Sequence, residues 1–409
     1  MKRNSLAGLV LVVISLLLVI PRLSSPVSSQ APSPTAPHIG EGGVPQFEKD
    51  PAFPKIPASM KMGFGSAVTG DDQGHVWILS RPKTLANPRS TAPDKTSKPA
   101  PPVMEFDQAG NYVQGWGGES GTGYQWPSNE HGMTVDSKGF VWVLGNADGA
   151  SNNPAKLPND NQVLKFTKAG KFVMAIGKSG LTGSNKTEVL KGATSVFYYG
   201  KTNEVFVSDG YGNNRVMVYD GDTGKFKRMW GAYGNKPLDM EDRPKRSAPN
   251  LTPWVAVAEV LQQFASPVHD VKVSNDGLVY VADRGNKRIQ VFTPDGKFIA
   301  EQFVGLDSKY GLQARGVAFS PDQRFLYVGG TPVVYILNRK TLEILGSFRT
   351  GHPDQAHPPG HQIGSDNKGN VYVVQAELTG AEGKDGETGG TGAQKFTFKG
   401  YSPTVRATN

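Results

Sequence analysis

Residues 131–144 read HGMTVDSKGFVWVL, and this stretch predicts two short strands joined by a tight turn. Apolar and small residues run to Val135, an Asp-Ser-Lys-Gly turn follows, and a second apolar run carries Trp142. The same pattern recurs five times, as SAVTGDDQGHVWIL (66–79), SVFYYGKTNEVFVS (195–208), HDVKVSNDGLVYVA (269–282), GVAFSPDQRFLYVG (316–329) and HQIGSDNKGNVYVV (361–374). A hairpin repeated six times predicts an antiparallel β protein built from one recurring unit.

The spacing of these hairpins sets the size of the unit. Their leading aromatic residues lie 45 to 74 positions apart, at Trp77, Trp142, Phe206, Tyr280, Tyr327 and Tyr372. Most hairpins continue into a third strand and a glycine turn, as in VLKFTKAGKFV (163–173) and IQVFTPDGKFI (289–299). Units of about four strands at this spacing are typical of propeller blades. The sequence therefore predicts an all-β, six-bladed β-propeller over residues 61–405. It leaves open how the ring closes, and a strand from residues near 45–53 that joins the last blade is one option.

The N-terminus has the pattern of an export signal. A basic start at Lys2 and Arg3 precedes an apolar run over residues 6–20 and a small, polar segment. Residues 1–30 are predicted to be a signal peptide and residues 31–60 a Pro- and Ser-rich linker. The apolar run is about 15 residues long, shorter than the roughly 20 that span a bilayer. An uncleaved anchor is thus the alternative to a secreted or periplasmic protein.

Composition narrows the classes of partner. The chain of 409 residues has a formal net charge of +8, and its Lys and Arg residues are spread rather than gathered in a stripe. Without such a stripe, and without an aromatic-basic motif, nucleic acid is excluded as a partner. No cysteine is present, so no disulfide or thioether lipid anchor can form. A small molecule or a peptide is the expected ligand.

Insertions rich in Pro and Gly are expected between the strands, at residues 82–102, 145–160, 232–264 and 376–392. Insertions on a propeller usually lie on one face, and that face often binds the ligand. Only residues 252–264 have a helical pattern. After the signal, no segment is apolar and long enough to predict a membrane span.

Three of the seven histidines share one place in the repeat. His131, His269 and His361 each lie 11 residues before the leading aromatic residue of blades 2, 4 and 6. Alternate blades of six stand about 120° apart, and the first strand of each blade lines the central channel. Three imidazoles would therefore converge on the axis, an arrangement that zinc accepts with one position left open. At the same place the other blades carry Ser66, Ser195 and Gly316.

Two other interpretations of the histidines remain open. Each could cap a strand or bond to a neighbouring carbonyl, as isolated histidines often do. A second set, His352, His357 and His361, lies within one Pro-rich loop of irregular sequence. His357, in that loop, could hydrogen-bond to one of the metal ligands without binding the metal itself.

Two longer stretches carry a resemblance to a known family. They are VFVSDGYGNNRVMVYDGDTGKFKRMWG (205–231) and VYVADRGNKRIQVF (279–292), together with the His-Gly pair at residue 131. These stretches resemble NHL-type propellers and, more narrowly, the peptidyl-α-hydroxyglycine α-amidating lyases, over most of residues 62–398. The resemblance implies a six-bladed propeller with a central zinc held by three histidines. It also implies cleavage of a C-terminal α-hydroxyglycine to a peptide amide and glyoxylate.

The resemblance implies roles for particular residues. The histidine trio takes the place of the zinc ligands, and Tyr211 in the Asp-Gly-Tyr turn takes that of the catalytic tyrosine. Arg81, after the second strand of the first blade, matches an active-site arginine. In such an enzyme zinc lowers the pKa of the substrate hydroxyl, and a base removes the proton. Tyrosine ordinarily titrates near 10, so a cation beside it would help it act as that base. The arginine could also bind the substrate carboxylate.

The sequence also departs from this family. Gly212 follows Tyr211 where the family often has a cysteine, and Gln362 follows His361 where the family has a carboxylate ligand of structural calcium. Zinc is therefore the expected cofactor, with calcium as a lesser expectation. Two other functions remain open: a non-catalytic NHL-repeat propeller that binds a protein, peptide or glycan, and a metal hydrolase such as a lactonase. A hydrolase of that kind usually needs carboxylates on the metal, and the histidine positions offer none.

Overall fold

The structure is a computed structural model that describes residues 43–86, 96–147, 160–243, 262–306, 308, 313–351, 360–375 and 392–402. The predicted signal peptide and the loop with His352 and His357 lie outside these residues. Of the predicted helix at 252–264, only residues 262–264 are described, and they form no helix. Within the described part of the chain, no helix has the length and apolarity needed to cross a membrane.

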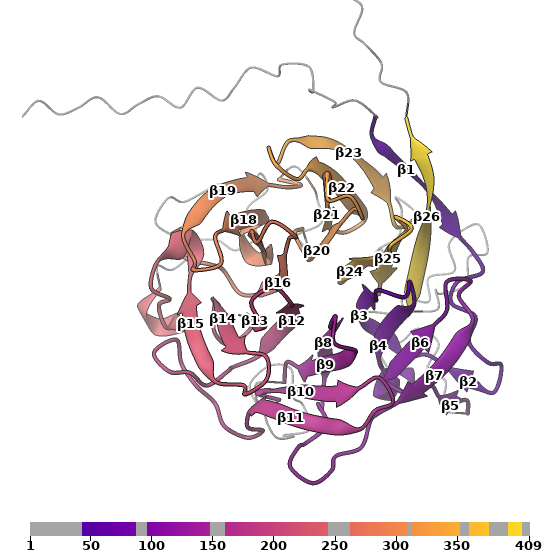
Figure 1. Cartoon of the computed structure of the whole chain (residues 1–409), viewed down its shortest axis with the longest axis horizontal. Coiled ribbons are helices and arrows are strands. Elements are labelled where there is room, and N and C mark those ends of the chain that lie inside the picture. The colour runs from indigo at the N-terminus through magenta and orange to yellow at the C-terminus, as the bar shows by residue number, and fades with distance from the viewer. Residues whose placement is uncertain are drawn as a thin grey trace, which may run out of the picture. The chain divides into compact units, whose positions relative to one another are not determined.

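Six antiparallel sheets of four strands stand around a central axis, which confirms the predicted six-bladed β-propeller (Figure 1). Blades 1 and 2 contain β3 (Phe64–Gly70), β4 (Val76–Arg81), β6 (Val103–Phe106), β7 (Tyr112–Trp116), β8 (Glu130–Val135), β9 (Phe140–Gly145), β10 (Gln162–Thr167) and β11 (Phe172–Gly177). Blades 3 and 4 contain β12 (Ala193–Tyr199), β13 (Glu204–Asp209), β14 (Arg215–Asp220), β15 (Phe226–Trp230), β16 (Val268–Val273), β17 (Val279–Asp283), β18 (Arg288–Phe292) and β19 (Phe298–Phe303). Blades 5 and 6 contain β20 (Gly316–Phe319), β21 (Phe325–Gly329), β22 (Val333–Asn338), β23 (Ile344–Arg349), β24 (Ile363–Ser365), β25 (Val371–Val374), β26 (Ala393–Tyr401) and β1 (Pro45–Asp50).

The remaining elements are short. A parallel pair joins β2 (Met60–Lys61) to β5 (Lys98–Pro99) beside blade 1. Four 3₁₀ turns lie in the connections, namely η1 (Pro82–Ala86), η2 (Ala232–Gly234), η3 (Met240–Asp242) and η4 (Arg284–Asn286). The first and last of these directly follow the second strands of blades 1 and 4.

The ring is closed by the strand nearest the N-terminus. β1 pairs antiparallel with β26, so the last blade combines strands from both ends of the described chain. Figure 1 shows the two strands side by side. This pairing shows how the ring closes, which the sequence left open, and the strand lies where residues near 45–53 offered one. It also corrects the predicted linker, because the described part of residues 31–60 contributes a strand to the propeller.

The turn of the hairpin explains why an aspartate stands six residues before the leading aromatic residue in several blades. In blade 2, Asp136 Oδ1 accepts the backbone N–H groups of Lys138 and Phe140, and Oδ2 accepts Nε1–H of Trp142 at 2.8 Å. An aspartate six residues before a Trp or Tyr therefore satisfies both the turn and the polar tip of the buried aromatic ring. The same contact joins Asp71 to Trp77 and Asp366 to Tyr372.

Apolar side chains fill the space between neighbouring blades. Between blades 2 and 3, Trp142 and Leu144 pack with Val196 and Val207, and all four are fully buried. Comparable clusters lie at the other five junctions. Burial of one such side chain contributes roughly 1.5–3 kcal/mol. The sheets therefore pack face to face, and the first strands are left to line the axis.

Candidate metal centre

The first strands bring six equivalent residues around the axis. In each blade, one residue of the first strand pairs with the leading aromatic residue of the second strand, as Thr134 pairs with Trp142 in blade 2. The equivalent residue lies three positions before that partner, which in blade 2 is His131. The complete set is Ser66, His131, Thr194, His269, Arg315 and His361. In blades 1 to 4 this residue stands at a shift in strand register. A β-bulge of this kind can direct a side chain out of the regular alternation of the strand.

In blades 3 and 5, the residue at the axis lies one position earlier than the sequence predicted. Phe206 pairs with Phe197, nine residues earlier, whereas Trp142 pairs with Thr134, eight residues earlier. The hairpins of blades 3 and 5 are thus one residue longer than those of blades 2, 4 and 6. Thr194 and Arg315 therefore take the places expected for Ser195 and Gly316.

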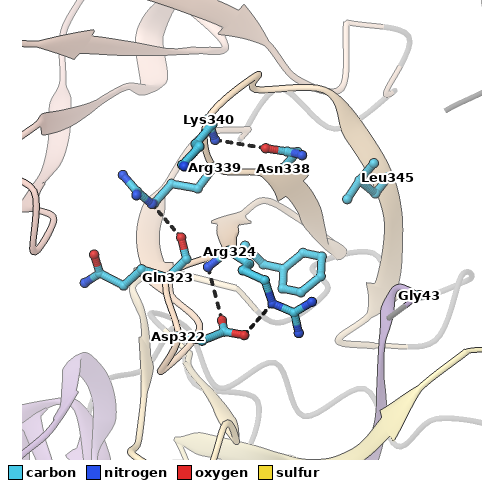
Figure 2. A pocket seen from close by; sticks show the side chains of 9 residues that line it. Gly43, Asp322, Gln323, Arg324, Asn338, Arg339, Lys340 and Leu345 are labelled. Atoms are coloured by element: carbon cyan, nitrogen blue, oxygen red, sulfur yellow. Dashed lines mark hydrogen bonds and ion pairs between the residues drawn. The ribbon is translucent and has the colours of Figure 1, made fainter. Parts of the chain in front are cut away.

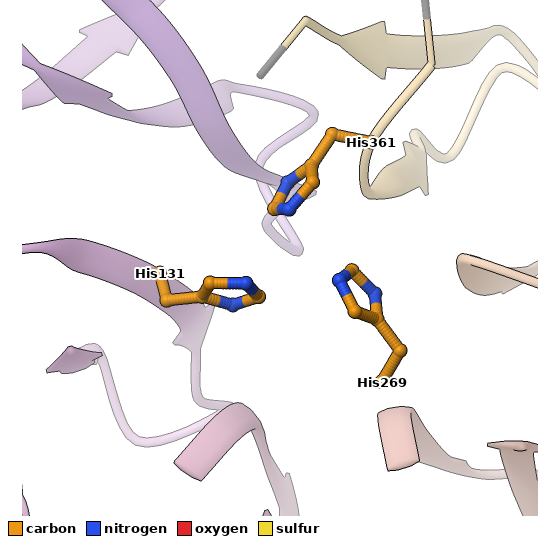
Figure 3. A group of neighbouring side chains, drawn as sticks. All are labelled: His131, His269 and His361. Atoms are coloured by element: carbon orange, nitrogen blue, oxygen red, sulfur yellow. The ribbon is translucent and has the colours of Figure 1, made fainter. Parts of the chain in front are cut away.

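The three histidines converge on one point, as the spacing predicted (Figure 3). The ring centroids of His131 and His269 are 5.0 Å apart, and those of His131 and His361 are 4.7 Å apart. The third pair, His269 and His361, is separated by 4.8 Å. One nitrogen from each ring lies within 4.8 Å of the other two. All three side chains are buried.

Backbone carbonyls determine which nitrogen of each ring carries a hydrogen. Nδ1 of each histidine donates to a carbonyl of the next blade: His131 to Thr194 (2.7 Å), His269 to Arg315, and His361 to Ser66 (2.7 Å). Since a carbonyl can only accept, each Nδ1 carries the proton and each neutral ring has its lone pair on Nε2. The blades without a histidine therefore orient the rings of the blades that have one.

The surroundings hold the three imidazoles in the neutral form. Burial is the largest cause that lowers the pKa of all three rings well below the ordinary value. For His131 the positive charge of Arg81 follows, and for His269 that of Arg284. For His361 the other two histidines follow. Neutral imidazoles are the form that ligates a metal.

These residues fit a zinc ion. Nε2 of His131 and Nε2 of His269 are buried without a hydrogen-bond partner, an unfavourable state that a metal would relieve. A Nδ1–H donor on a carbonyl, with Nε2 free to ligate, is the usual arrangement of zinc-binding histidines. Three nitrogens on one tetrahedral zinc lie roughly 3.3 Å apart, and these rings bring one nitrogen each within 4.8 Å of the other two.

Tyr211 lies against the histidines, just after β13. Its ring centroid is 5.5 Å from that of His131 and 6.3 Å from that of His269, edge-on in both cases. Its carbonyl accepts the hydroxyl of Ser266 at 2.9 Å, which ties the turn to blade 4. The tyrosine singled out by the sequence is thus next to two of the three histidines.

The glycines beside Tyr211 are required by close packing. A Cβ on Gly210 would lie 1.8 Å from the carbonyl oxygen of Val268 in blade 4. A Cβ on Gly212 would lie 2.3 Å from the side chain of Lys191. A cysteine at residue 212 therefore has no room, which explains this departure from the family that the sequence resembles.

Arg81 ends β4 and reaches across to blade 2. Its Nε donates to the carbonyl of Glu130 at 2.6 Å, directly before His131 in the chain. Burial lowers the pKa of Arg81, while the nearby Tyr211 and Glu130 raise it. The guanidinium remains charged at any ordinary pH. The structure therefore brings Arg81 into the same group as Tyr211 and the histidines.

Arg284 completes this group, and the sequence analysis did not single it out. It follows β17, and its Nη1 donates to the hydroxyl oxygen of Tyr211 at 3.3 Å. A signal for it exists in the sequence, because Arg81 and Arg284 each lie four residues after the leading aromatic of their blades (Trp77 and Tyr280). Two guanidinium groups thus lie near one tyrosine.

Gln362 and Asp270, which directly follow His361 and His269, are both engaged in contacts between blades. Gln362 donates through Nε2 to the carbonyl of Thr194 at 3.0 Å, so it acts as a crosslink between blades. Asp270 accepts Ser195 Oγ–H at 2.5 Å on one oxygen and Val317 N–H at 2.9 Å on the other. The Lys272 ammonium lies 3.7 Å from the first oxygen. A carboxylate engaged in this way is a poor ligand for a cation.

A second group, Asp71, His75 and Glu105, has its ligand atoms close together in blade 1. The ammonium of Lys168 lies 2.8 Å from Asp71 Oδ2, where a metal ion would compete with it. His75 Nδ1 contacts Glu105 Oε1 at 2.6 Å, so the ring is committed to that carboxylate. We interpret this group as part of the hairpin turn and not as a metal site.

A pocket of 390 Å³ lies elsewhere, beside the turns of blade 5 (Figure 2). Asp322, Arg324 and Arg339 line it, and these three charged groups are engaged in ion pairs. Arg324 Nε is 2.5 Å from Asp322, and Arg339 pairs with Asp276 at 2.9 Å. The pocket lies at the opposite ends of the strands from the histidines, so it is not part of the metal centre.

Comparisons with known proteins agree with this architecture. A family model for the NHL repeat matches residues 268–292, which are the three inner strands of blade 4. The chain is similar to peptidyl-glycine alpha-amidating monooxygenase B of Xenopus laevis (26% identical over 255 residues, 60% of this chain and 25% of that protein). It is also similar to NHL repeat-containing protein 3 of Mus musculus (27% over 295 residues, 67% and 70%). A third relative is a probable peptidyl-alpha-hydroxyglycine alpha-amidating lyase of Caenorhabditis elegans (27% over 164 residues, 40% and 36%).

The matched region spans about a quarter of the length of the Xenopus monooxygenase. The repeat match includes His269 and Arg284, so it covers part of the group around the axis. The chain is a six-bladed β-propeller that contains an NHL repeat and is related both to peptidylglycine amidating enzymes and to NHL repeat-containing proteins.

Proposed function

We propose that this protein is a zinc-dependent lyase that cleaves the C–N bond of N-acyl-α-hydroxyglycines and releases a primary amide and glyoxylate. One observation carries the proposal: three buried imidazoles direct one nitrogen each to a common point, with Tyr211 and two arginines beside them. Similarity to relatives named as amidating enzymes supports the same choice. His131, His269 and His361 would hold the zinc.

The arginines would bind the acidic end of the substrate. An N-acyl-α-hydroxyglycine carries a carboxylate next to the carbon that bears the hydroxyl. A guanidinium matches a carboxylate in charge and in planar geometry, and the pair can form two parallel hydrogen bonds. Arg81 and Arg284 lie near Tyr211 and the histidines, so a substrate held by them would place its hydroxyl near both.

Tyr211 would act as the base. Arg284 Nη1 donates to its hydroxyl oxygen at 3.3 Å and so fixes the position of the atom that would take up the substrate proton. The hydroxyl proton moves to Tyr211, the O–H electron pair forms the C=O bond of glyoxylate, and the C–N bond breaks. The nitrogen leaves with the bonding pair and takes that proton from Tyr211, which gives the amide and regenerates the base. No water, oxidant or reductant is consumed.

Bound zinc would supply Lewis acidity that lowers the pKa of the substrate hydroxyl. The chain's own contribution is to keep the three imidazoles neutral and fixed in orientation through the carbonyls of Ser66, Thr194 and Arg315. Because the histidines are buried, water is kept from the ligand nitrogens of His131 and His269.

Metal analysis of the purified chain tests the first part of the proposal. We expect one zinc per chain, and we expect it to be lost in the double variant His131→Ala/His269→Ala. His75→Ala is the matched control, because His75 lies in the hairpin turn of blade 1 and contacts Glu105. A wild-type chain without a stoichiometric divalent metal would contradict the metal site.

Activity tests the second part. The zinc-loaded chain is mixed with α-hydroxyhippurate, and glyoxylate and benzamide are measured. Equal amounts of both products are expected from the elimination. Fully loaded protein that releases neither product would remove the lyase proposal and leave a metal-stabilised propeller.

A non-catalytic binding propeller is the second candidate. The alignment with NHL repeat-containing protein 3 covers more of this chain than that with the amidating monooxygenase, 67% against 60%. That function does not require Tyr211 or Arg284, so it predicts that ligand binding survives their substitution. We also propose that the chain is exported through its N-terminal apolar segment, which N-terminal sequencing of the mature protein would test.

A further inference from the structure

We infer that Arg315 is a positioning residue that holds His269 and His361, two of the three histidines, in the arrangement that binds the metal. The inference rests on the metal site of the proposed function. Arg315 stands at the equivalent ring position of blade 5, between the histidine blades 4 and 6. It is the one charged residue among the six, because the others are histidine, serine and threonine.

The first contact runs through the main chain of Arg315. Its carbonyl oxygen accepts Nδ1–H of His269, which orients that ring toward the axis. Ser66 and Thr194 make the same kind of contact with His361 and His131. In this respect Arg315 acts like the other residues of the histidine-free blades.

The second contact runs through the side chain, and the other histidine-free blades make it as well. Ser66 Oγ–H donates to the carbonyl of Glu130 at 2.7 Å and Thr194 Oγ1–H to that of Val268 at 2.6 Å, the residues directly before His131 and His269.

Arg315 makes this contact with a guanidinium in place of a hydroxyl. Its Nη1 donates to the carbonyl of Gly360, the residue directly before His361. The same nitrogen donates to Oγ1 of Thr331 at 3.0 Å, which anchors the guanidinium within blade 5. One side chain therefore links blade 5 to the backbone that carries the histidine of blade 6.

The backbone around these contacts is held in an unusual conformation. Ala314, directly before Arg315, has a φ of 52° and is fully buried. A residue with a Cβ is strained in the left-handed region, and such strain persists where surrounding contacts over-determine it. At the other end of the hydrogen bond from Arg315, a Cβ on Gly360 would lie 2.5 Å from the carbonyl oxygen of Gly330. Both ends of the link are thus closely packed.

Arg315→Met and Arg315→Lys test this inference, with Arg339→Met as the matched control. Arg339 is another buried arginine of blade 5, but it pairs with Asp276 at the opposite end of the blade. The zinc dissociation constant of the full chain is measured by chelator competition. Outer contacts of metal-binding histidines typically contribute 10–100-fold in affinity. We expect Arg315→Met to weaken zinc binding by that factor, Arg315→Lys to weaken it less, and Arg339→Met to leave it unchanged while lowering the unfolding midpoint.

A second readout needs no metal. In metal-free protein labelled with ¹⁵N-histidine, Arg315→Met should shift the ring resonances of His361 most, because the carbonyl of Gly360 loses its donor. Those of His269 should shift less, because the carbonyl that accepts its Nδ1–H remains in the variant. Those of His131 should move least, because the carbonyl of Thr194 orients that ring and only the charge of Arg315 reaches it. Zinc affinity within twofold of wild type together with unchanged ring resonances would overturn the inference. If the wild-type chain binds no zinc, the proposed function fails, and the ring resonances alone decide whether Arg315 positions the histidines. If Arg315→Met does not fold, Arg315→Lys carries the same comparison.

Discussion

Arg284 Nη1 donates to the hydroxyl oxygen of Tyr211 at 3.3 Å, across the junction of blades 3 and 4. The two residues occupy equivalent places in two copies of one motif. In blade 3, Asp209 forms a buried ion pair with Arg215 at 3.0 Å, and in blade 4 the corresponding pair, Asp283 and Arg288, is separated by 2.8 Å. The loop between the paired residues carries Tyr211 in one blade and Arg284 in the other. The repeat therefore provides two equivalent Asp–Arg ion pairs, and the loops that they hold place a tyrosine and an arginine in contact beside the histidines.

Replacing Tyr211 by Phe should remove the base and leave the metal centre intact. We expect kcat for glyoxylate release to fall by roughly 10²–10⁴-fold, the usual contribution of a positioned acid or base. Zinc content and the unfolding midpoint should match the wild type, because the phenyl ring keeps its edge-on contact with His131. Tyr112→Phe, in β7, is the control. A Tyr211→Phe enzyme with wild-type kcat would assign the base to another residue.

Replacing Arg284 by Gln should weaken substrate binding and the support of Tyr211. A hydrogen bond to a charged group contributes about 1.5–3 kcal/mol, so we expect kcat/KM to fall by roughly 10–100-fold. Comparison of α-hydroxyhippurate with its methyl ester isolates the carboxylate. The preference of the wild type for the free acid should shrink in the variant. Arg228→Gln, which removes an ion pair with Glu204, serves as control. An undiminished preference in Arg284→Gln would place the carboxylate elsewhere.

The regularity of the repeat determines how much of this site could be predicted from sequence. His131, His269 and His361 stand in blades whose hairpins have equal length, so one count finds all three. The hairpin of blade 5 is one residue longer, and the same count falls on Gly316 and misses Arg315. From the sequence alone, one extra residue in the turn looks the same as a shift of one residue in the strand pairing. The count therefore could not assign Arg315 to the position at the axis.

Other features depend on packing between blades, which a single sequence does not encode locally. The contact of Arg284 with Tyr211 joins residues 73 positions apart. The closing strand β1 has few apolar residues, and its pairing with β26 is set by the geometry of the ring. Composition suggested a linker up to residue 60 because Pro and Ser are frequent there, whereas the pairing begins at Pro45.

Zinc should stabilise the fold only when the histidine trio is intact. A ligand that binds only the native state at 100 times its Kd contributes about 2.7 kcal/mol. We expect this gain in the free energy of unfolding for the wild type and none for His361→Ala. Metal-free His361→Ala should unfold near the metal-free wild type, because only one ring and its bond to Ser66 are lost. Equal zinc stabilisation of both chains would exclude His361 as a ligand.

Weakening the closing strand should destabilise the whole ring. Phe47 of β1 lies 4.7 Å from the ring centroid of Phe348 and 5.6 Å from that of Tyr327. Its side chain is partly buried, so Phe47→Ala should cost roughly 2–3 kcal/mol, below the range for a fully buried phenylalanine. The urea midpoint is the measurement, and Gln46→Ala, at an exposed position of the same strand, is the control. A midpoint equal to that of the control would show that the ring is held closed without this contact.

Blade 3 should lose stability in acid through Glu204. Burial alone would raise the pKa of this carboxyl group, but hydrogen bonds from Arg228, Lys227 and Thr202 outweigh burial and lower the pKa to about 2, from 4.5. A carboxyl group with a lowered pKa in the folded state contributes stability above its unfolded value. That contribution is lost as the pH falls from about 4.5 to about 2. At about 1.4 kcal/mol per pKa unit, the full shift would correspond to about 3.5 kcal/mol. Because Lys227 and Arg228 are partly exposed and solvent screens their charges, we expect roughly 1–2 kcal/mol. We expect Glu204→Gln to be less stable than the wild type at pH 7 and to lose less stability between pH 5 and pH 2.5, as followed by urea unfolding at each pH. Parallel pH curves for the two chains would mean that the acid sensitivity of the fold arises from other carboxyl groups.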